Sequence, residues 1–380
     1  ANTEIYTLSL HDALPIWLID STLREGAQAP VPYLNSAQKS SLVAAIAAIG
    51  VEEIELGHAV TELAYGAEPL ADLMAVAAEA APGVRRAIWC RARPDDIRAA
   101  AALNPEVVSF ALPVSDRHLT NRLNRDRAWA LTEVARLIDV AREAGVAYVS
   151  IGLEDASRAD VAFLLDVAAA ASAAGADRVR IADTVGVLSP GLLAEVVSAV
   201  RSRFTGEVGV HLHNDFGMAT AGAIASLEAG AAWADVSLLG MGERAGIART
   251  EEVAAFLTLQ GSATYDLHAV RRAAEALSEW TGRPIPGHAP VIGPDIFTSE
   301  SGLHVAALAR DPQTYEPYAP ELVGAERSLR LGRQSGRSAV AALLGDTGAD
   351  LVELTAQVRA AASQEHHAVD PSEARRLLGA

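Results

Sequence analysis

Short runs of apolar and β-branched residues recur about every 30 residues, and Ala- and Leu-rich stretches of helical periodicity lie between them. Such alternation is typical of repeated βα units. The runs cover 17–20, 53–57, 84–91, 107–112, 146–153, 178–183, 208–213 and 233–239. Eight strands separated by helices predict an α/β fold, a closed parallel (β/α)8 TIM barrel, rather than an open sheet, because no GxGxxG phosphate loop follows the first run.

The pattern divides the chain into four parts. Residues 1–16 show no strand or helix pattern that continues into the first strand, and we interpret them as a non-native or disordered extension. The catalytic barrel is predicted over 17–265. One more helical segment and a cluster of Gly, Pro and His then indicate a linker over 266–295. Short helices and polar loops fill 296–380, which is predicted to be a small, mostly helical subdomain, too small for an independent domain.

Charge and cysteine content limit the partners and the compartment that suit this chain. Its 48 Asp and Glu against 31 Lys and Arg give a formal net charge of −17, which argues against a nucleic-acid partner. Cys90 is the only cysteine, so an intramolecular disulfide and a cysteine-cluster metal site are excluded, and a reducing cytoplasm fits. No run of about 18 or more apolar residues lacks charges, so no membrane span is predicted.

Polar side chains gather at the carboxyl ends of the predicted strands, where barrel enzymes place their reacting groups. They are Arg24 and Glu25 after the first strand, Arg91 at the third, Glu154 and Arg158 at the fifth, Thr184 after the sixth, and His211 and His213 at the seventh. A purely structural barrel would not need these groups at one rim. Salt bridges at the rim and caps at strand ends are the structural alternatives for single members of this set.

The spacing of His211 and His213 indicates a metal site. Residues two apart on a strand point to the same face and can hold one ion together. A carboxylate from another strand would complete a set that leaves positions open on Zn²⁺, Mn²⁺ or Mg²⁺ for substrate oxygens. Hydrogen bonding in a polar barrel mouth is the structural alternative for this pair.

Several longer motifs occur in order along the chain. They are DSTLREGAQ at 20–28, EDASR at 154–158, ADTVGVLSP at 182–190, HLHNDFGMATAGA at 211–223, GMGERAGI at 240–247, FTSESGLH at 297–304, TYEPYAPELVG at 314–324 and LGRQSGRSA at 331–339. In these motifs the chain resembles the acetyl-CoA-dependent 2-oxo-acid synthases of the 2-isopropylmalate synthase and homocitrate synthase family and, more distantly, hydroxymethylglutaryl-CoA lyase. The quoted matches span nearly everything after residue 17.

The resemblance implies a role for each candidate residue. The metal ligands would be Glu25, His211 and His213; the catalytic residues Arg24, Glu154 and His304; the groups facing the 2-oxo acid Arg91, Arg158 and Thr184; and the groups on the coenzyme A side Gly240, Gly242 and Glu243. His304 would enter the active site of a partner subunit, so the resemblance implies a homodimer with swapped C-terminal subdomains. A divalent metal would act as a Lewis acid on the ketone of the 2-oxo acid.

The resemblance also implies the reaction, a Claisen-type condensation by an acyltransferase that converts the acyl group of acetyl-CoA to an alkyl group on transfer. EDASR and residues 115–131 look most like the homocitrate synthases associated with nitrogenase cofactor assembly, so 2-oxoglutarate is the expected oxo acid, with homocitrate and CoA as products. GAQ at 26–28 replaces the common GEQ, and ATAGA at 219–223 replaces ATANA. Oxaloacetate, a phosphinyl analogue and 2-oxoisovalerate therefore stay open as alternatives.

Two other functions also stay open. A lyase of the same barrel would cleave rather than join, although lyases of that type lack the SGLH and TYE segments that this chain has. A catalytically silent barrel would act only as a binding partner. The intact set of metal-binding residues argues against the silent barrel.

Overall fold

A computed structural model describes residues 15–60, 70–345 and 348–378. The predicted extension at 1–16 lies, except for its last two residues, outside this part of the chain. The chain divides into two compact units, with the boundary between Pro284 and Ile285.

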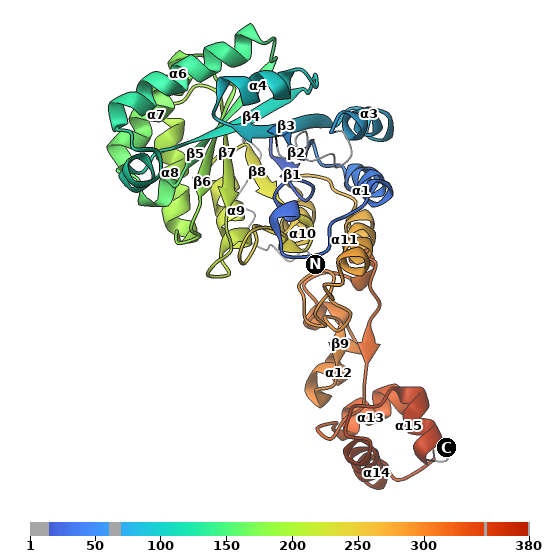
Figure 1. The fold of residues 1–380 in the computed structure, drawn as a ribbon. Helices are drawn as coiled ribbons and strands as arrows, with labels where there is room; N and C mark the ends of the chain where they lie inside the picture. Colours follow the sequence, from blue (N-terminus) through green and yellow to red (C-terminus); the bar gives the residue numbers. More distant parts are fainter. Residues whose placement is uncertain (1–14, 61–69, 346–347, 379–380) are drawn as a thin grey trace. The chain divides into compact units, whose positions relative to one another are not determined.

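The first unit is a closed barrel of eight strands in the order β1 to β8, and every neighbouring pair is parallel (Figure 1). The strands are β1 (Trp17–Asp20), β2 (Glu53–His58), β3 (Arg85–Arg91), β4 (Val107–Pro113), β5 (Tyr148–Glu154), β6 (Arg178–Asp183), β7 (Glu207–Leu212) and β8 (Trp233–Val236). Pairing of Trp17 with Trp233 in the register of β1 and β8 closes the barrel. The predicted (β/α)8 fold is confirmed.

Helices follow the barrel strands along the chain and cover the outside of the barrel (Figure 1). They are α1 (Ser36–Ile49), α3 (Leu70–Ala80), α4 (Pro94–Ala101), α5 (Asp116–His118), α6 (Arg127–Glu143), α7 (Val161–Ala173), α8 (Pro190–Arg201), α9 (Ala219–Glu228), α10 (Thr250–Leu259) and α11 (Leu267–Thr281). Their starts are set by short polar side chains that accept a hydrogen bond from the first turn, such as Asn35, Asp126 and Asp160. No helix in the described ranges is long and apolar enough to cross a membrane.

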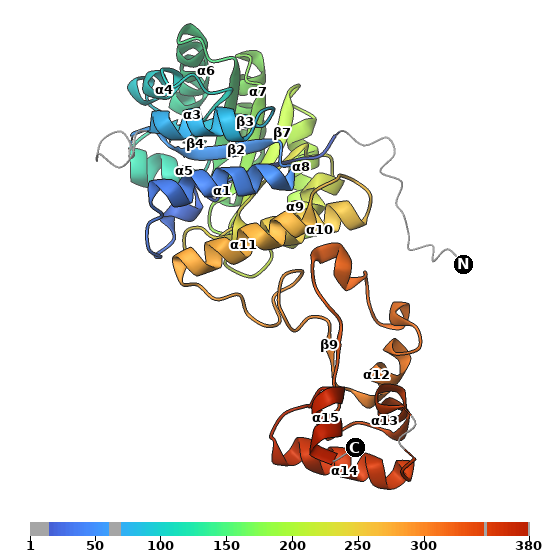
Figure 2. The same ribbon diagram turned by 90° about the vertical axis from the view of Figure 1, so that its right-hand side faces the viewer.

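The helix expected ahead of the linker is α11, which begins at Leu267 inside the range 266–295 and packs beside α1 (Figure 2). Its N-cap, Asp266, is tied to the end of α1 because its N–H donates to the carbonyl of Ile49 at 2.8 Å. The buried side chains of α1 are Leu42, Val43, Ile46 and Ile49. This apolar face is the side of the helix that covers the barrel.

The last barrel strand is shorter than predicted, since it ends at Val236 and not at residue 239. Residues Leu238–Gly240 form the 3-10 turn η5, in which Leu239 has a φ of 58°. A strand cannot contain a residue in this left-handed conformation. The turn therefore redirects the chain across the barrel mouth.

Hydrogen-bonded polar side chains, rather than the usual branched aliphatic ones, fill one layer of the barrel interior. Glu55, Ser109, Arg180 and Asp235 come from the four even-numbered strands and are all buried. Arg180 donates to the other three, at 2.9 Å to Glu55, 2.7 Å to Asp235 and 2.6 Å to Ser109. We call these four residues the Arg180 layer.

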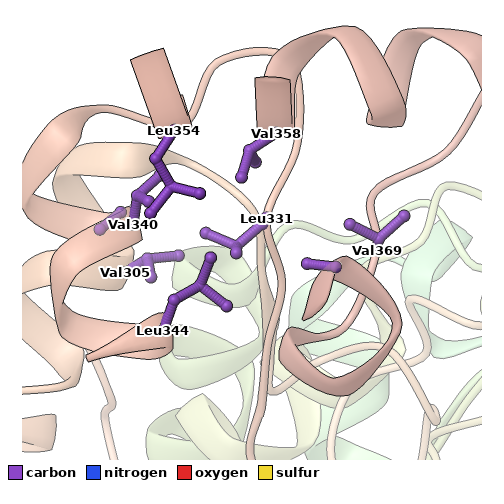
Figure 3. Packing of buried hydrophobic residues seen from close by; sticks show 9 residues of the cluster. Val305, Leu331, Val340, Leu344, Leu354, Val358 and Val369 are labelled. Carbon is purple, nitrogen blue, oxygen red and sulfur yellow. The ribbon is translucent and has the colours of Figure 1, made fainter. Parts of the chain in front are cut away.

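The second unit has a hydrophobic core of its own. It contains β9 (Thr298–Ser299), α12 (Gly302–Leu308), β10 (Ser328–Leu329), α13 (Arg337–Leu344), α14 (Leu351–Gln364) and α15 (Pro371–Leu378). Figure 3 shows Leu331 among the side chains of Val305, Val340, Leu354 and Val369. These residues are spread along the sequence, so their cluster is not visible as a single periodic run.

A buried acid, Glu251, ties α10 to the η5 turn. One of its carboxylate oxygens accepts the N–H of Leu239 at 3.0 Å, and the other has no hydrogen-bond partner in the described part of the chain. Burial raises the pKa of Glu251 from its ordinary 4.5 to about 7. The pKa of Glu251 is higher in the folded than in the unfolded chain. Its contribution to stability is therefore fully present at a pH below the pKa of the unfolded chain, and it is lost as the pH rises through the pKa of the folded chain.

We therefore expect Glu251→Gln to be more stable than the wild type at about pH 8, by up to about 3 kcal/mol, and to match it near pH 4.5. Urea unfolding of both proteins at the two pH values measures this difference. Glu252→Gln is the control, because the neighbouring Glu252 is partly exposed to water. A stability difference for Glu251→Gln that does not change with pH would contradict the prediction.

Candidate active site with a metal centre

Glu25, His211 and His213 lie together at the barrel mouth, although the first two are 186 positions apart in the sequence. One ligand atom from each lies within 4.8 Å of the others. The Oε2 atom of Glu25 and the Nε2 atom of His211 are 3.9 Å apart. The three predicted ligands therefore converge on one point.

Local structure explains how each ligand reaches this point. After β1 the chain makes a tight turn, in which the carbonyl of Ser21 accepts the N–H groups of Arg24 at 3.1 Å and Glu25 at 2.7 Å. His211 lies on β7, and its Nδ1 atom is 2.8 Å from the Oδ2 atom of Asp235 on β8. His213 follows β7 and forms an isolated antiparallel bridge with Ile247, beyond the η5 turn.

The surroundings of two of the ligands favour the forms that bind a metal, a carboxylate at Glu25 and a neutral imidazole at His213. Burial alone would raise the pKa of Glu25, but Arg24 and the two imidazoles lower it below its ordinary value. Burial, together with the neighbouring His211, lowers the pKa of His213 to about 4. At neutral pH, His213 is therefore an uncharged imidazole with a free lone pair.

The three side chains fit a divalent cation. The Nδ1 atom of His213 is buried and has no hydrogen-bond partner within the described residues, an arrangement that is costly unless something binds it. Two imidazole nitrogens and one carboxylate oxygen suit Zn²⁺, Mn²⁺ and similar ions, and they leave coordination positions open. The geometry supports a metal centre without distinguishing between these metals.

Arg24 is held beside the ligands by two carboxylates. Its Nη1 atom is 2.5 Å from the Oε2 atom of Glu25, and its Nε atom donates to Glu55 at 2.8 Å. Gln28 also donates to Glu25, at 2.7 Å. The guanidinium is a nearly buried positive charge of fixed direction next to the proposed ion.

A cavity of about 950 Å³ opens in front of this centre. Among the predicted residues it is lined by Arg24, Glu25, Arg91, Glu154, Thr184, His211, His213 and Glu243. It is also lined by two aromatic side chains, Trp89 and Trp129, and by further arginines that include Arg93 and Arg125. The space suits a ligand larger than a small oxo acid alone.

Three predicted residues that line the cavity, the catalytic Glu154 and the substrate-side Arg91 and Thr184, each contact a neighbouring group. Arg122 makes two hydrogen bonds to the carboxylate of Glu154, at 2.7 and 2.6 Å, and so fixes its direction. Arg91 is paired with Asp96 at 2.5 Å, whereas the Thr184 hydroxyl accepts the N–H of Asp155 at 2.8 Å. These contacts place the three predicted groups at the wall of the cavity.

Arg158 is the exception, since it does not line this cavity. Its Nε atom donates to the carboxylate of Asp155 at 2.8 Å, and its Nη2 atom lies 3.2 Å from the ring of His118. Asp155 itself has a φ of 63°, a left-handed conformation that this pairing helps to hold. Arg158 is thus paired within the turn after β5, and its predicted contact with the oxo acid stays a prediction.

The loop predicted for the coenzyme A side contacts the metal centre directly. The backbone N–H of Glu243 donates to the Oε1 atom of Glu25 at 3.1 Å, and Glu243 alone of the three predicted loop residues lines the cavity. A Cβ atom at Gly242 would lie 3.1 Å from the Cγ atom of Glu25, so a side chain there would crowd the ligand. Gly240 has a φ of 61°, which favours glycine at that turn.

His304 lies in the second unit, on α12, and is exposed. Its ring packs against Tyr315, with 4.1 Å between the ring centroids. The predicted roles of His304 and of the other site residues stay predictions.

Sequence reasoning missed three members of this site, Gln28, Arg180 and Asp235. The last two have a signal in the sequence, because they are charged residues inside otherwise apolar strand runs. A charge at such a position faces the barrel interior and must find a partner there. Gln28 is close in sequence to Glu25 and carries no comparable signal.

Comparisons with known proteins agree with this architecture. The HMGL-like family model matches residues 15–277, and the model for the homocitrate synthase post-HMGL domain matches 291–370. A homocitrate synthase from Frankia alni is 39% identical over 344 residues, covering 88% of this chain and 94% of the relative. A 2-isopropylmalate synthase from Caldanaerobacter subterraneus is 36% identical over 344 residues, 89% of this chain and 87% of the relative.

The fold is also found in solved structures. A crystal structure of hydroxymethylglutaryl-CoA lyase from Pseudomonas aeruginosa matches with a TM-score of 0.63 at 23% identity, covering 72% of this chain and 95% of that one. The likeness shows a shared barrel. With both family models matched in order, the chain belongs to the HMGL-like family, among the condensing enzymes that carry the homocitrate synthase post-HMGL domain.

Proposed function

We propose that this protein condenses acetyl-CoA with a 2-oxo acid, and that the oxo acid is 2-oxoglutarate, which gives homocitrate and CoA. The observation that carries the proposal is the convergence of Glu25, His211 and His213 beside Arg24, at the base of a cavity large enough for both substrates. The match to the post-HMGL domain and the homocitrate synthase relative support the choice of product.

The residues divide the chemistry between them. When bound, a divalent cation held by Glu25, His211 and His213 supplies a Lewis acid next to the ketone. Arg24 adds a fixed positive charge where negative charge develops on the ketone oxygen, and because Glu55 and Glu25 already orient it, little reorganisation is needed. His304, from the second unit of a partner subunit in a homodimer, accepts the methyl proton of acetyl-CoA together with Glu154.

Two arginines of the cavity support an oxo acid with a second anionic group. Most of the other lining arginines are paired with carboxylates, but within the described ranges Arg93 and Arg125 have no carboxylate partner. Arg125 instead stacks on Trp129, with its guanidinium carbon 5.6 Å from the ring centroid. An unpaired guanidinium favours a carboxylate, as in 2-oxoglutarate or oxaloacetate, or the phosphorus oxyacid of a phosphinyl analogue, over the apolar end of 2-oxoisovalerate.

The alternatives make different demands on the same site. The 2-isopropylmalate synthase relative supports a branched oxo acid, for which the arginines would have no partner in the substrate. A lyase would use the same metal ligands in the reverse direction. A silent barrel would need no orphaned nitrogen on His213.

A thiol-release assay with acetyl-CoA tests the proposal. We expect 2-oxoglutarate to release CoA fastest among 2-oxoglutarate, oxaloacetate, 2-oxoisovalerate and pyruvate. It should exceed 2-oxoisovalerate by at least about 10-fold, because the branched acid has no second acidic group to pair with Arg93 and Arg125. Mass spectrometry of the product identifies the acid that is formed. Release with none of the four acids would refute the condensation, and preference for 2-oxoisovalerate would refute the choice of oxo acid.

Removal of the metal or of one ligand should abolish turnover. We expect Glu25→Gln to lower kcat on the order of 10³-fold, because the carboxylate supplies the charged ligand and also orients Arg24. A chelator should inactivate the wild type, and added Mn²⁺, Mg²⁺ or Zn²⁺ should restore it. Asp215→Asn is the control, since Asp215 lies at the same rim but pairs with Arg244. Full activity after exhaustive chelation would exclude the metal centre.

The assignment of the proton acceptor has its own test. We expect His304→Ala to lower kcat by about 10²- to 10⁴-fold, the usual range for a lost general base, and to change KM for the oxo acid much less. His367→Ala, another exposed histidine of the second unit, should leave turnover unchanged. Solvent exchange of the acetyl-CoA methyl protons is the matching measurement, and undiminished exchange in His304→Ala would place the base elsewhere.

A further inference from the structure

The Arg180 layer lies directly beneath the proposed metal centre. It contacts a proposed metal ligand, His211, and the neighbouring arginine, Arg24. Asp235 Oδ2 is 2.8 Å from Nδ1 of His211 and also accepts Arg180 at 2.7 Å. Glu55 accepts Arg180 at 2.9 Å and Arg24 at 2.8 Å. One continuous series of charged contacts therefore runs from a metal ligand, through three buried side chains, to the arginine beside the ketone.

Stability alone is a poor explanation for this series. Burying charged groups costs desolvation energy that their attraction only partly offsets, and apolar residues of similar volume are often as stable. The Oδ1 atom of Asp235 is buried without a hydrogen-bond partner among the described residues, so this carboxylate is not fully satisfied by the fold. Its satisfied oxygen, Oδ2, is the one that contacts His211.

The contact also sets which nitrogen of His211 is available. An ionised carboxylate can only accept, so Nδ1 of His211 must carry the proton that it donates to Asp235. Nε2, which is 3.9 Å from Glu25, is then left with its lone pair facing the centre. The three carboxylates Glu25, Glu55 and Asp235 exceed the two guanidinium groups of Arg24 and Arg180 by one negative charge, which favours a cation.

We propose that Asp235 is a positioning residue that holds His211 in its metal-binding tautomer, and that Arg180 couples this contact to Glu55 and thereby to Arg24. The inference rests on the metal centre of the proposed function. Asp235 fixes the ring of His211, while Glu55 fixes the direction of Arg24. Burial would raise the pKa of Glu55, but Arg180 and Arg24 lower it below its ordinary value, so this carboxylate stays a charged acceptor for Arg24 and Arg180.

The barrel supplies a matched control one layer away. Glu53 and Arg178 precede Glu55 and Arg180 by two residues on the same strands, and they form an equally buried pair with a closest distance of 2.6 Å. Neither residue contacts a proposed ligand or lines the cavity. Glu53→Gln therefore removes a buried charge from the same barrel interior without removing a hydrogen bond of the series.

Titration of the full-length, metal-stripped protein with Mn²⁺, followed by the electron paramagnetic resonance of free Mn²⁺, tests the inference. We expect Asp235→Asn to raise the Kd for Mn²⁺ by about 10- to 100-fold, as for other groups that orient a ligand, and Glu53→Gln to change it less than about 3-fold. Unchanged affinity in Asp235→Asn, or an equal loss in Glu53→Gln, would overturn it. Absence of Mn²⁺ binding by the wild type would instead refute the metal centre itself.

A measurement on the wild type keeps the test decisive if the Asp235 variant does not fold. Nitrogen-15 spectra of histidine-labelled, metal-free protein report the tautomer of each ring, and His211→Gln identifies the signals of His211. We expect Nδ1 to be protonated and Nε2 unprotonated at about pH 8. Protonation at Nε2 would contradict the role of Asp235.

Discussion

Closure of the barrel by the parallel pairing of β1 with β8 is the constraint on which the site depends. That pairing places the turn after β1, with Arg24 and Glu25, next to the loop that follows β8 and to the end of β7. The N–H of Glu243 then reaches Glu25, and His211 comes within 3.9 Å of it. The carboxylate of Glu25 and the imidazoles of His211 and His213 come from opposite sides of this seam, so the ligand set depends on it.

Placing several charges inside one barrel requires that each charge has a partner, and the Arg180 layer meets this requirement with one cation and two anions. Arg180 is shared by Glu55 and Asp235, and each of these carboxylates reaches one functional group above it. Hydrogen bonds and ion pairs replace aliphatic packing in this layer. Because these contacts are directional, they fix the positions of the side chains more narrowly than the dispersion contacts of aliphatic packing do. The barrel interior thus acts as a support for the site and not only as its core.

The sequence predicted the parts of this molecule that depend on local patterns. Strand and helix alternation identified the barrel, and the spacing of His211 and His213 indicated the metal ligands that the structure brings together with Glu25. The sequence did not predict contacts between distant strands, such as those of Arg180. The register of the barrel strands decides which interior charges meet, and no local pattern shows that register. The left-handed turn at Leu239 was missed for a different reason, since an apolar run continues through it and only the backbone conformation ends the strand.

Electrostatic contrast between the surface and the cavity connects the fold to its substrates. The whole chain carries a net charge of −17, yet six arginines and only four glutamates line the cavity. A cleft with apolar walls concentrates the field of such charges, so anionic oxo acids and the phosphates of coenzyme A are attracted at the cavity while the remaining surface repels them. The cationic groups near the ligands are mostly neutralised by fixed carboxylates, and the arginines without such partners are exposed. The exposed, unpaired arginines therefore attract the anionic substrates as they approach the cavity. The inner, paired charges orient the reacting groups.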